Sequence, residues 1–157
     1  MRPINNVVDA TNYAMLELGE PLHAFDYDVL QKRAGGKPVK IITRTARNGE
    51  TLVTLDNIDR KLDENTILVC DEAGILSLAG VMGGLESEVT DTTRNILLEG
   101  ATWNMINIRR TARAQNLPSE ASYRFTRGVH PAMAETGVRR GLDLMKLWAN
   151  GTPDALL

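Results

Sequence analysis

The stretch TILVCDEAGILSLAGVMGG, residues 66–84, holds two short apolar runs, separates them with a turn, and then breaks into glycines. Apolar runs of this length that are rich in β-branched residues and joined by so short a turn predict neighbouring antiparallel strands. A buried strand gains nothing from Gly80, Gly83 and Gly84, because glycine packs poorly and loses more backbone entropy on folding than other residues. These three glycines therefore need an explanation of their own.

The strand pattern extends in both directions from this stretch, from about residue 38 to residue 100. Turn sequences such as RNGE and DENT separate the further short runs VKIITRTA, ETLVTLD and RNILLEGA. Outside this region the apolar spacing is helical, with one helix ending at Gly19 and a second, DYDVLQKR, ending before Gly35. After residue 100 the spacing predicts helices in TWNMINIRRTARAQN, around SEASYRFTRG, and from near Pro131. We therefore expect an α+β fold, in which a mainly antiparallel β-sheet (about 38–100) is flanked by N-terminal and C-terminal helices.

The length and composition are those of an ordinary globular domain. With 157 residues, 43% of them apolar and 24% charged, the chain suits a single domain spanning residues 1–157. It contains no apolar run of membrane-spanning length and no signal peptide. The single cysteine, Cys70, excludes an internal disulfide and a Cys-based zinc cluster, and its apolar surroundings predict a buried thiol. A cytoplasmic location is expected.

Charge is distributed unevenly along the chain. Residues 1–100 carry 10 Lys and Arg against 16 Asp and Glu, whereas residues 101–157 carry 8 against 4. The basic segments INIRRTARAQ and GVRRGLDLMK are compatible with an anionic partner such as RNA. They are also typical of solvated helix faces, and charge alone favours that second interpretation.

The glycine cluster does not have the pattern of a phosphate-binding loop. A P-loop requires Lys and Ser or Thr after its last glycine, but Leu85 and Glu86 follow Gly84. The Gly-x-Gly-x-x-Gly spacing of dinucleotide-binding proteins is also missing. Two interpretations remain: a tight turn with positive φ, or bare backbone N–H and C=O groups that face a ligand.

Two other residues are candidates for a site, although neither is decisive alone. His23 lies in GEPLHAFD, which we expect to be a connector between two helices, where a histidine is often functional. His130 directly precedes Pro131 and is interpreted as a helix-boundary residue, and the two histidines lack metal-site spacing. Glu99 closes an apolar strand, so it either caps the following helix, stays exposed, or reaches into a pocket as an acceptor.

Four segments taken together are far more specific than any one of them. RPINNVVDATNYAMLELGEPLHAFD, AGVMGG, NILLEGA and SEASYRFTRGVHP, in this order, resemble the editing module of the bacterial phenylalanyl-tRNA synthetase β subunit. The resemblance runs from Arg2 to about Trp148. It implies an aminoacyl-tRNA ester hydrolase that removes tyrosine mis-attached to tRNA(Phe). The physical logic is that a hydrophobic pocket rejects an isostere with an added hydroxyl only about 100-fold, whereas a site that hydrogen-bonds the hydroxyl discriminates by about 10⁴–10⁵.

The resemblance also implies roles for individual residues. Thr11, Asn12 and His23 match positions near the ester and the amino group, where they would place the ester and the attacking water. Glu99 matches the acceptor for the tyrosine hydroxyl. None of the four is a clear nucleophile, and the resemblance implies direct attack by water.

The remaining implied residues would form the wall of the pocket. The backbone of Ala79, Gly80, Gly83 and Gly84 would hold the amino acid, and Ala121 matches a small residue whose enlargement would block the pocket. The resemblance implies no metal and no cofactor for editing, since ATP and magnesium belong to the parent synthetase. It implies as partners the acceptor end of tRNA(Phe), the remainder of the β subunit and the catalytic α subunit, and no membrane. The alternative is a non-catalytic RNA-binding or structural module of the synthetase.

Overall fold

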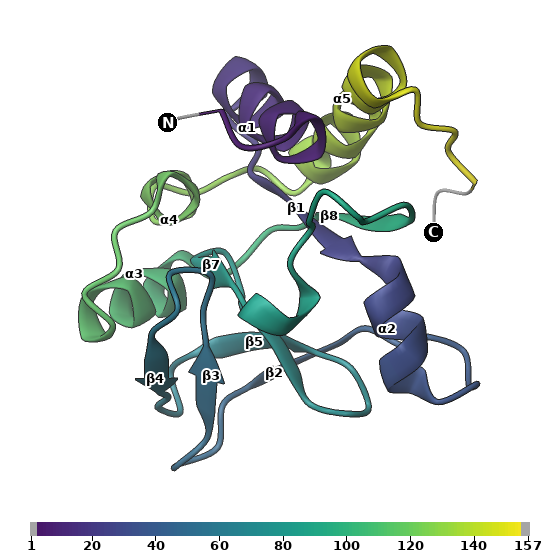
Figure 1. The fold of residues 1–157 in the computed structure, drawn as a ribbon. Helices are drawn as coiled ribbons and strands as arrows, with labels where there is room; N and C mark the ends of the chain where they lie inside the picture. The colour runs from purple at the N-terminus through teal and green to yellow at the C-terminus, as the bar shows by residue number, and fades with distance from the viewer. Residues whose placement is uncertain (1–2, 155–157) are drawn as a thin grey trace.

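The computed structural model describes residues 3–154 and confirms the α+β class (Figure 1). The helices are α1 (Asn6–Leu18), α2 (Tyr27–Ala34), α3 (Met105–Ala114), α4 (Glu120–Phe125) and α5 (Ala132–Ala149), with a 3-10 turn η1 at Leu85–Ser87. The strands are β1 (Leu22–Asp26), β2 (Ile42–Thr45), β3 (Thr51–Val53), β4 (Asp59–Lys61), β5 (Ile67–Cys70), β6 (Ile75–Leu78), β7 (Met82–Gly83) and β8 (Ile96–Gly100). Every pairing between these strands is antiparallel, as predicted.

Helix ends follow the signals in the sequence. Gly19 and Gly35 end α1 and α2 in the left-handed conformation, with φ of 77° and 60°. Helix α1 begins at Asn6, because the side chain of Asn5 caps it by accepting the Val8 N–H at 2.9 Å. His130 is indeed a boundary residue, since its Nδ1 accepts the backbone N–H of Ala132 at the start of α5.

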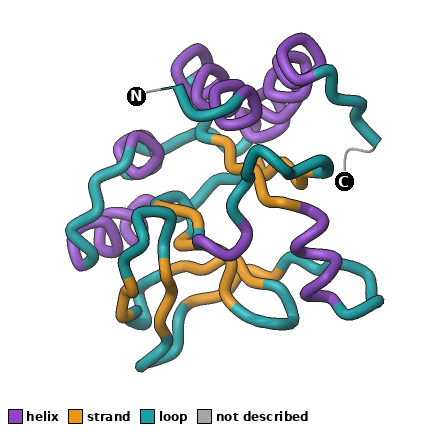
Figure 2. Tube along the Cα trace, viewed as in Figure 1, coloured by secondary structure: helices purple, strands orange, loops and turns teal. Residues whose placement is uncertain are grey.

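The strands form three sheets rather than one. Strands β2, β5, β6 and β7 make a four-stranded sheet in the order β2-β5-β6-β7, while β1 pairs with β8 and β3 pairs with β4 (Figure 2). The hairpin expected from residues 66–84 is present, with Leu68 opposite Leu78.

Three strands were not expected from the sequence, and the two-residue strand β7 is one of them. The segment GEPLHAFD was expected to be a connector, but it forms β1, whose partner β8 lies far downstream in the sequence. Because helices cover one face of β1 and the sheet covers the other, the strand shows no alternation of apolar and polar residues. Strand β4 was missed because it is polar, with Arg60 as its only buried residue.

The β1–β8 pair lies between a helical layer and the four-stranded sheet (Figure 1). On one face of the pair, Leu22, Ile96 and Leu98 pack against the core of α1 and α5, which is formed by Ala10, Ala14, Leu144 and Met145. On the other face, Phe25 and Leu97 pack against Val69, Leu76 and Ala79. Side chains that point from β1 and β8 toward the sheet are therefore held in the interior.

Helices α3 and α4 cover a second part of the four-stranded sheet. Ile108 of α3 and Phe125 of α4 pack on Leu78 and Val81. Cys70 is buried in the same cluster, as its apolar surroundings predicted, and burial raises the pKa of its thiol. None of the helices in residues 3–154 has the length and apolar character needed to cross a membrane.

Candidate functional site

His23 and Glu99 lie directly opposite each other in the β1–β8 pair. Residues directly opposite in an antiparallel pair point to the same face, with Cβ atoms about 5 Å apart. Their face also carries Phe25 and Leu97, which pack toward the four-stranded sheet. Two residues that lie far apart in the sequence are thus side by side on the face that points toward the sheet, each of them half-buried.

The surroundings of His23 keep its imidazole neutral. The ring meets the ring of Phe25 edge-on, with 4.4 Å between the centroids. Burial lowers the pKa of His23 to about 4. At neutral pH this side chain is an uncharged donor and acceptor and a poor general base.

Glu99 is a buried acceptor that lacks a protein donor. Burial raises the pKa of its carboxyl to about 7. Its Oε2 atom is buried and has no hydrogen-bond partner among the described residues. The capping interpretation is wrong, because Asn104 caps α3 by accepting the N–H groups of Ile106 and Asn107. An unsatisfied buried carboxylate oxygen is costly, and a hydroxyl on a bound ligand would satisfy it.

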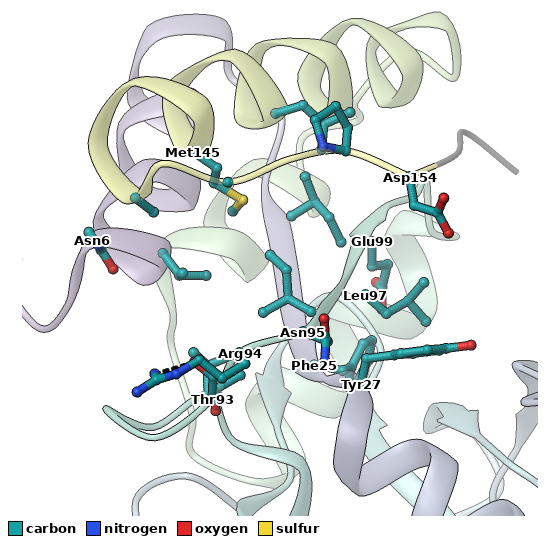
Figure 3. Close-up of a pocket in the computed structure, with 18 of the residues that line it drawn as sticks. Asn6, Phe25, Tyr27, Thr93, Arg94, Asn95, Leu97, Glu99, Met145 and Asp154 are labelled. Atoms are coloured by element: carbon teal, nitrogen blue, oxygen red, sulfur yellow. Dashed lines mark hydrogen bonds between the residues drawn. The ribbon is translucent and has the colours of Figure 1, made fainter.

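A groove of about 1070 Å³ runs along β8 and is bordered by Glu99. Figure 3 shows Glu99 and Leu97 lying between Asp154 above and Tyr27 below. Phe25 and Met145 contribute further apolar lining. Of the residues implicated by the sequence, Glu99 is the one that lines this groove, so it has buried neighbours on one side and an opening on the other.

Gly83 and Gly84 allow other parts of the protein to come unusually close. A Cβ atom on Gly83 would lie 2.6 Å from Cε1 of His23. A Cβ atom on Gly84 would lie 2.4 Å from the carbonyl oxygen of Leu76, which accepts the Gly84 N–H at 2.8 Å. Neither glycine has positive φ, so the turn interpretation fails for both, and close packing explains them. Their contact with a ligand stays a prediction.

Gly80 does occupy a tight turn. Its φ is 65°, and the N–H of Val81 closes the turn onto the C=O of Leu78 at 3.0 Å. A Cβ atom on Gly80 would also lie 2.7 Å from Trp103 and 2.9 Å from Phe125. Glycine is therefore required here both by the backbone conformation and by the lack of space.

The other predicted site residues lie around this centre. Ala79 is buried beside Phe25, and Ala121 of α4 packs on the cluster that contains Phe125. Thr11 and Asn12 come from α1, which packs against β1, and the Thr11 hydroxyl donates to its own helix at the C=O of Val8 (2.8 Å). The structure thus joins His23, Glu99 and Gly83 directly and places Thr11 and Asn12 in the adjoining helical layer.

Sequence reasoning missed several residues of this region. Phe25 contacts the His23 ring, Leu55 and His23 together fill the space above Gly83, and Trp103 fills the space above Gly80. It also missed Glu20, a fully buried carboxyl in the segment GEPLHAFD, whose position between Gly19 and Pro21 was the available signal. Residues 3–154 contain no group of three His, Cys, Asp or Glu side chains arranged to hold a metal ion.

Comparison with known proteins identifies the relatives of this chain. A family model described as the B3/4 domain matches residues 1–150. The chain is 50% identical over 151 residues, 96% of its length, to the phenylalanine–tRNA ligase β subunit of Dehalococcoides mccartyi strain CBDB1. It is 49% identical over 152 residues (97% of its length) to the β subunit of Symbiobacterium thermophilum, and 45% over 157 residues (100%) to that of Nocardia farcinica. It spans 18%, 16% and 18% of these three relatives, respectively.

Proposed function

The chain belongs to the B3/4 domain family found in phenylalanine–tRNA ligase β subunits, and we propose that it hydrolyses tyrosine mis-attached to tRNA(Phe). In this role it acts in the cytoplasm as one module of a longer β subunit. Its partners are the acceptor end of tRNA(Phe), the remainder of that subunit and the catalytic α subunit. The reaction needs no cofactor, because water attacks an ester that is already activated.

The unsatisfied oxygen of Glu99 is the observation that carries this proposal. Tyrosine differs from phenylalanine by one hydroxyl, so a selective site needs one buried acceptor with no competing protein donor. Oε2 of Glu99 fits that requirement, and Glu99 borders a groove of mixed lining in which Phe25, Leu97 and Met145 supply apolar side chains for an aromatic ring. A phenylalanyl group would leave the acceptor unpaired, and such mismatches are penalised far more than a missing methylene.

His23 fits a positioning role in the hydrolysis. The oxygen of water attacks the ester carbonyl, the bond to the ribose oxygen breaks, and that oxygen leaves with a proton as the free tRNA hydroxyl. With a pKa of about 4, His23 is too weak a base to take the proton from water efficiently at neutral pH. As a neutral imidazole it can still hydrogen-bond the ester or the water, and Gly83 leaves room for its ring. In this role, its replacement lowers the rate by disturbing the position of the ester.

The test compares the release of tyrosine and of phenylalanine from tRNA(Phe) charged with each. We expect Glu99→Ala to abolish the preference for tyrosyl over phenylalanyl esters, and His23→Ala to slow release of tyrosine. Glu64→Ala, at an exposed glutamate, is the matched control and should retain both rate and preference. Normal discrimination by Glu99→Ala would remove Glu99 from the site. Binding of tyrosyl-tRNA without turnover by the parent chain would instead favour a non-catalytic RNA-binding module.

A further inference from the structure

We propose that exposed arginines of α3 and of the turn after α4 form a docking surface for the phosphates of RNA. This surface, called here the arginine surface, consists of Arg109, Arg110, Arg113 and Arg127 together with the ring of Tyr123. The inference deepens the proposed function and rests on it, because it says which face of the module receives the RNA whose ester enters the site.

The positive charge of the second part of the chain is concentrated in the segment 101–130, which contains α3 and α4. Residues 101–130 hold five arginines, no lysine and a single acid, Glu120. Residues 131–157 carry three basic and three acidic residues, and residues 1–100 carry an excess of acids. In a chain of net charge −2, an anion would be attracted to one region and repelled by most of the rest.

The arginines of this surface also differ in how they are paired. Six arginines of residues 3–154 form ion pairs with carboxylates: Arg33, Arg44, Arg60, Arg124, Arg139 and Arg140. None of the four on the arginine surface has a carboxylate partner in the described part of the chain. Their charges are therefore available to an external anion.

Neutral partners nevertheless hold Arg109, Arg110 and Arg127 in place. Arg109 donates to the C=O of Thr126 at 2.9 Å, which fastens α3 to the end of α4. Arg110 donates to the side chain of Asn65 at 3.0 Å. Arg113 lies one helical turn after Arg109, so the two share one side of α3. Bonds to carbonyl and amide oxygens restrict a guanidinium without cancelling its charge, which lowers the entropy lost when it binds a phosphate.

Arg127 and Tyr123 add a feature that favours RNA over a simple anion. The Arg127 guanidinium donates to the C=O of Tyr123 at 2.7 Å, and its central carbon lies 3.4 Å from the centroid of the tyrosine ring. The Tyr123 side chain is 57% exposed. Guanidinium groups bind phosphates bidentately, and nucleobases stack on both tyrosine rings and guanidinium planes.

The arginine surface lies on the outer side of α3 and α4, whose inner sides pack around the Gly80 turn. Ile108 and Phe125, on the buried sides of α3 and α4, contact the space above Gly80. RNA bound to the outer sides would therefore lie about one helix diameter, roughly 10 Å, from that turn. A single-stranded acceptor end can span this distance with a few nucleotides.

The test measures binding of a deacylated tRNA(Phe) transcript to the full chain at several KCl concentrations. We expect the double variant Arg113→Glu and Arg127→Glu to bind at least tenfold more weakly, with the slope of log K against log salt reduced by about 1.4–1.8. The double variant Lys32→Glu and Arg47→Glu is the matched control, since these exposed basic residues also lack carboxylate partners among residues 3–154 but lie away from both α3 and the groove. It should bind within twofold of the parent. Changing Arg113 and Arg127 to lysine should keep most of the salt dependence.

A second measurement separates this inference from the proposed function. Hydrolysis of 3′-O-tyrosyl-adenosine, which lacks the RNA body, should be unchanged in the Arg113→Glu and Arg127→Glu variant, while hydrolysis of tyrosyl-tRNA at subsaturating concentration should fall at least tenfold. If the parent hydrolyses neither substrate, the proposed function fails, but the binding measurement still decides the inference. Equal RNA affinity in the parent and the Arg113→Glu and Arg127→Glu variant, or an equal loss in the control, overturns it. The first of these results would point to an acidic protein surface as the partner.

Discussion

His23 and Glu99, directly opposite each other on β1 and β8, have pKa values in the reverse of their usual order. Burial lowers the pKa of the histidine to about 4 and raises that of the glutamate to about 7. Between these values both side chains are neutral, so these two residues together carry no charge. The two residues therefore need no counter-ion in this range, and they acquire a charge when Glu99 ionises at higher pH or His23 is protonated at lower pH.

The preference for tyrosyl over phenylalanyl esters should rise with pH between about 6 and 8. A carboxylate accepts a hydrogen bond from a phenol more strongly than a carboxylic acid does, and Glu99 ionises in this range because its pKa is raised to about 7. The measurement is the ratio of the two hydrolysis rates at each pH, in which effects common to both esters cancel. Glu99→Gln cannot ionise and should give a ratio independent of pH; a parallel rise in that variant would contradict the assignment.

Gly83→Ala should lower both stability and hydrolysis because it competes with His23 for space. A Cβ atom at this position would lie 2.6 Å from Cε1 of His23 and 3.1 Å from Leu55, so the imidazole must move. Overpacking of this kind costs about 1–3 kcal/mol of unfolding free energy. Urea denaturation of Gly83→Ala, His23→Ala and the double variant forms a mutant cycle. The double variant should lose clearly less unfolding free energy than the two single variants lose together. Strict additivity would show that the two residues do not compete for space.

Some features of the fold could be predicted from the sequence and others could not, as particular residues show. The hairpin around residues 66–84 and the glycine stops of α1 and α2 were predictable because short-range patterns encode them. Strand β1 was not, because its pairing with β8 is long-range and both of its faces are covered. For the same reason the sequence indicated a turn or a ligand contact at Gly83. Its actual neighbour is the ring of His23, which lies on β1, far upstream in the sequence.

In the candidate site, too, some residues could be identified from the sequence, whereas their contacts depend on the fold. Glu99 could be identified as a residue out of place at the end of an apolar strand, but its unsatisfied oxygen depends on where Asn104 and the groove lie. The arginines of α3 and α4 were visible as a basic segment. Their lack of carboxylate partners in the described residues depends on the tertiary arrangement, because the paired Arg33 and Arg140 find their acids far away in the sequence.

Arg33→Ala should strongly destabilise the protein. Arg33 on α2 donates twice to the carboxylate of Asp71, at 2.6 and 2.9 Å, and both side chains are nearly buried. Removing one partner of a buried pair leaves the other charge uncompensated and costs about 3–5 kcal/mol. Glu86→Ala removes the exposed partner of the same arginine and should cost less than about 1 kcal/mol. Chemical denaturation at pH 7 compares the two, and similar losses would mean that Asp71 is not the main partner.

Acid should weaken this same pair. Burial alone would raise the pKa of Asp71, but the hydrogen bonds from Arg33 and from the N–H of Gly74 outweigh it, so the pKa lies below its usual value. A carboxyl with a lowered pKa stabilises the fold above its unfolded value near 3.8, and that contribution is lost as pH falls through the folded value. The stability difference between the parent and Arg33→Ala should therefore shrink below about pH 4.

Glu20→Gln should stabilise the protein at alkaline pH and have little effect in acid. Glu20 is fully buried, and neither of its carboxyl oxygens has a hydrogen-bond partner among the described residues. Its side chain packs closely against α5, because a Cβ atom on Gly137 would lie only 2.5 Å from Cγ of Glu20. Burial raises its pKa to about 7, above the unfolded value of 4.5. The folded state thus binds more protons than the unfolded state between these values, so stability falls as pH rises from about 4.5 to about 7 and stays lower above.

The glutamine side chain in Glu20→Gln cannot ionise, so the variant avoids this loss of stability and keeps the shape of the side chain. Urea denaturation at pH 4, 6 and 8 should give similar free energies for parent and variant at pH 4, and an advantage for the variant of up to about 3 kcal/mol at pH 8. The opposing titration of His23 is common to both proteins and cancels in the difference. Glu64→Gln, at an exposed glutamate, should show no such trend. An advantage of Glu20→Gln that is the same at all three pH values would mean that improved packing, and not the buried charge, is responsible.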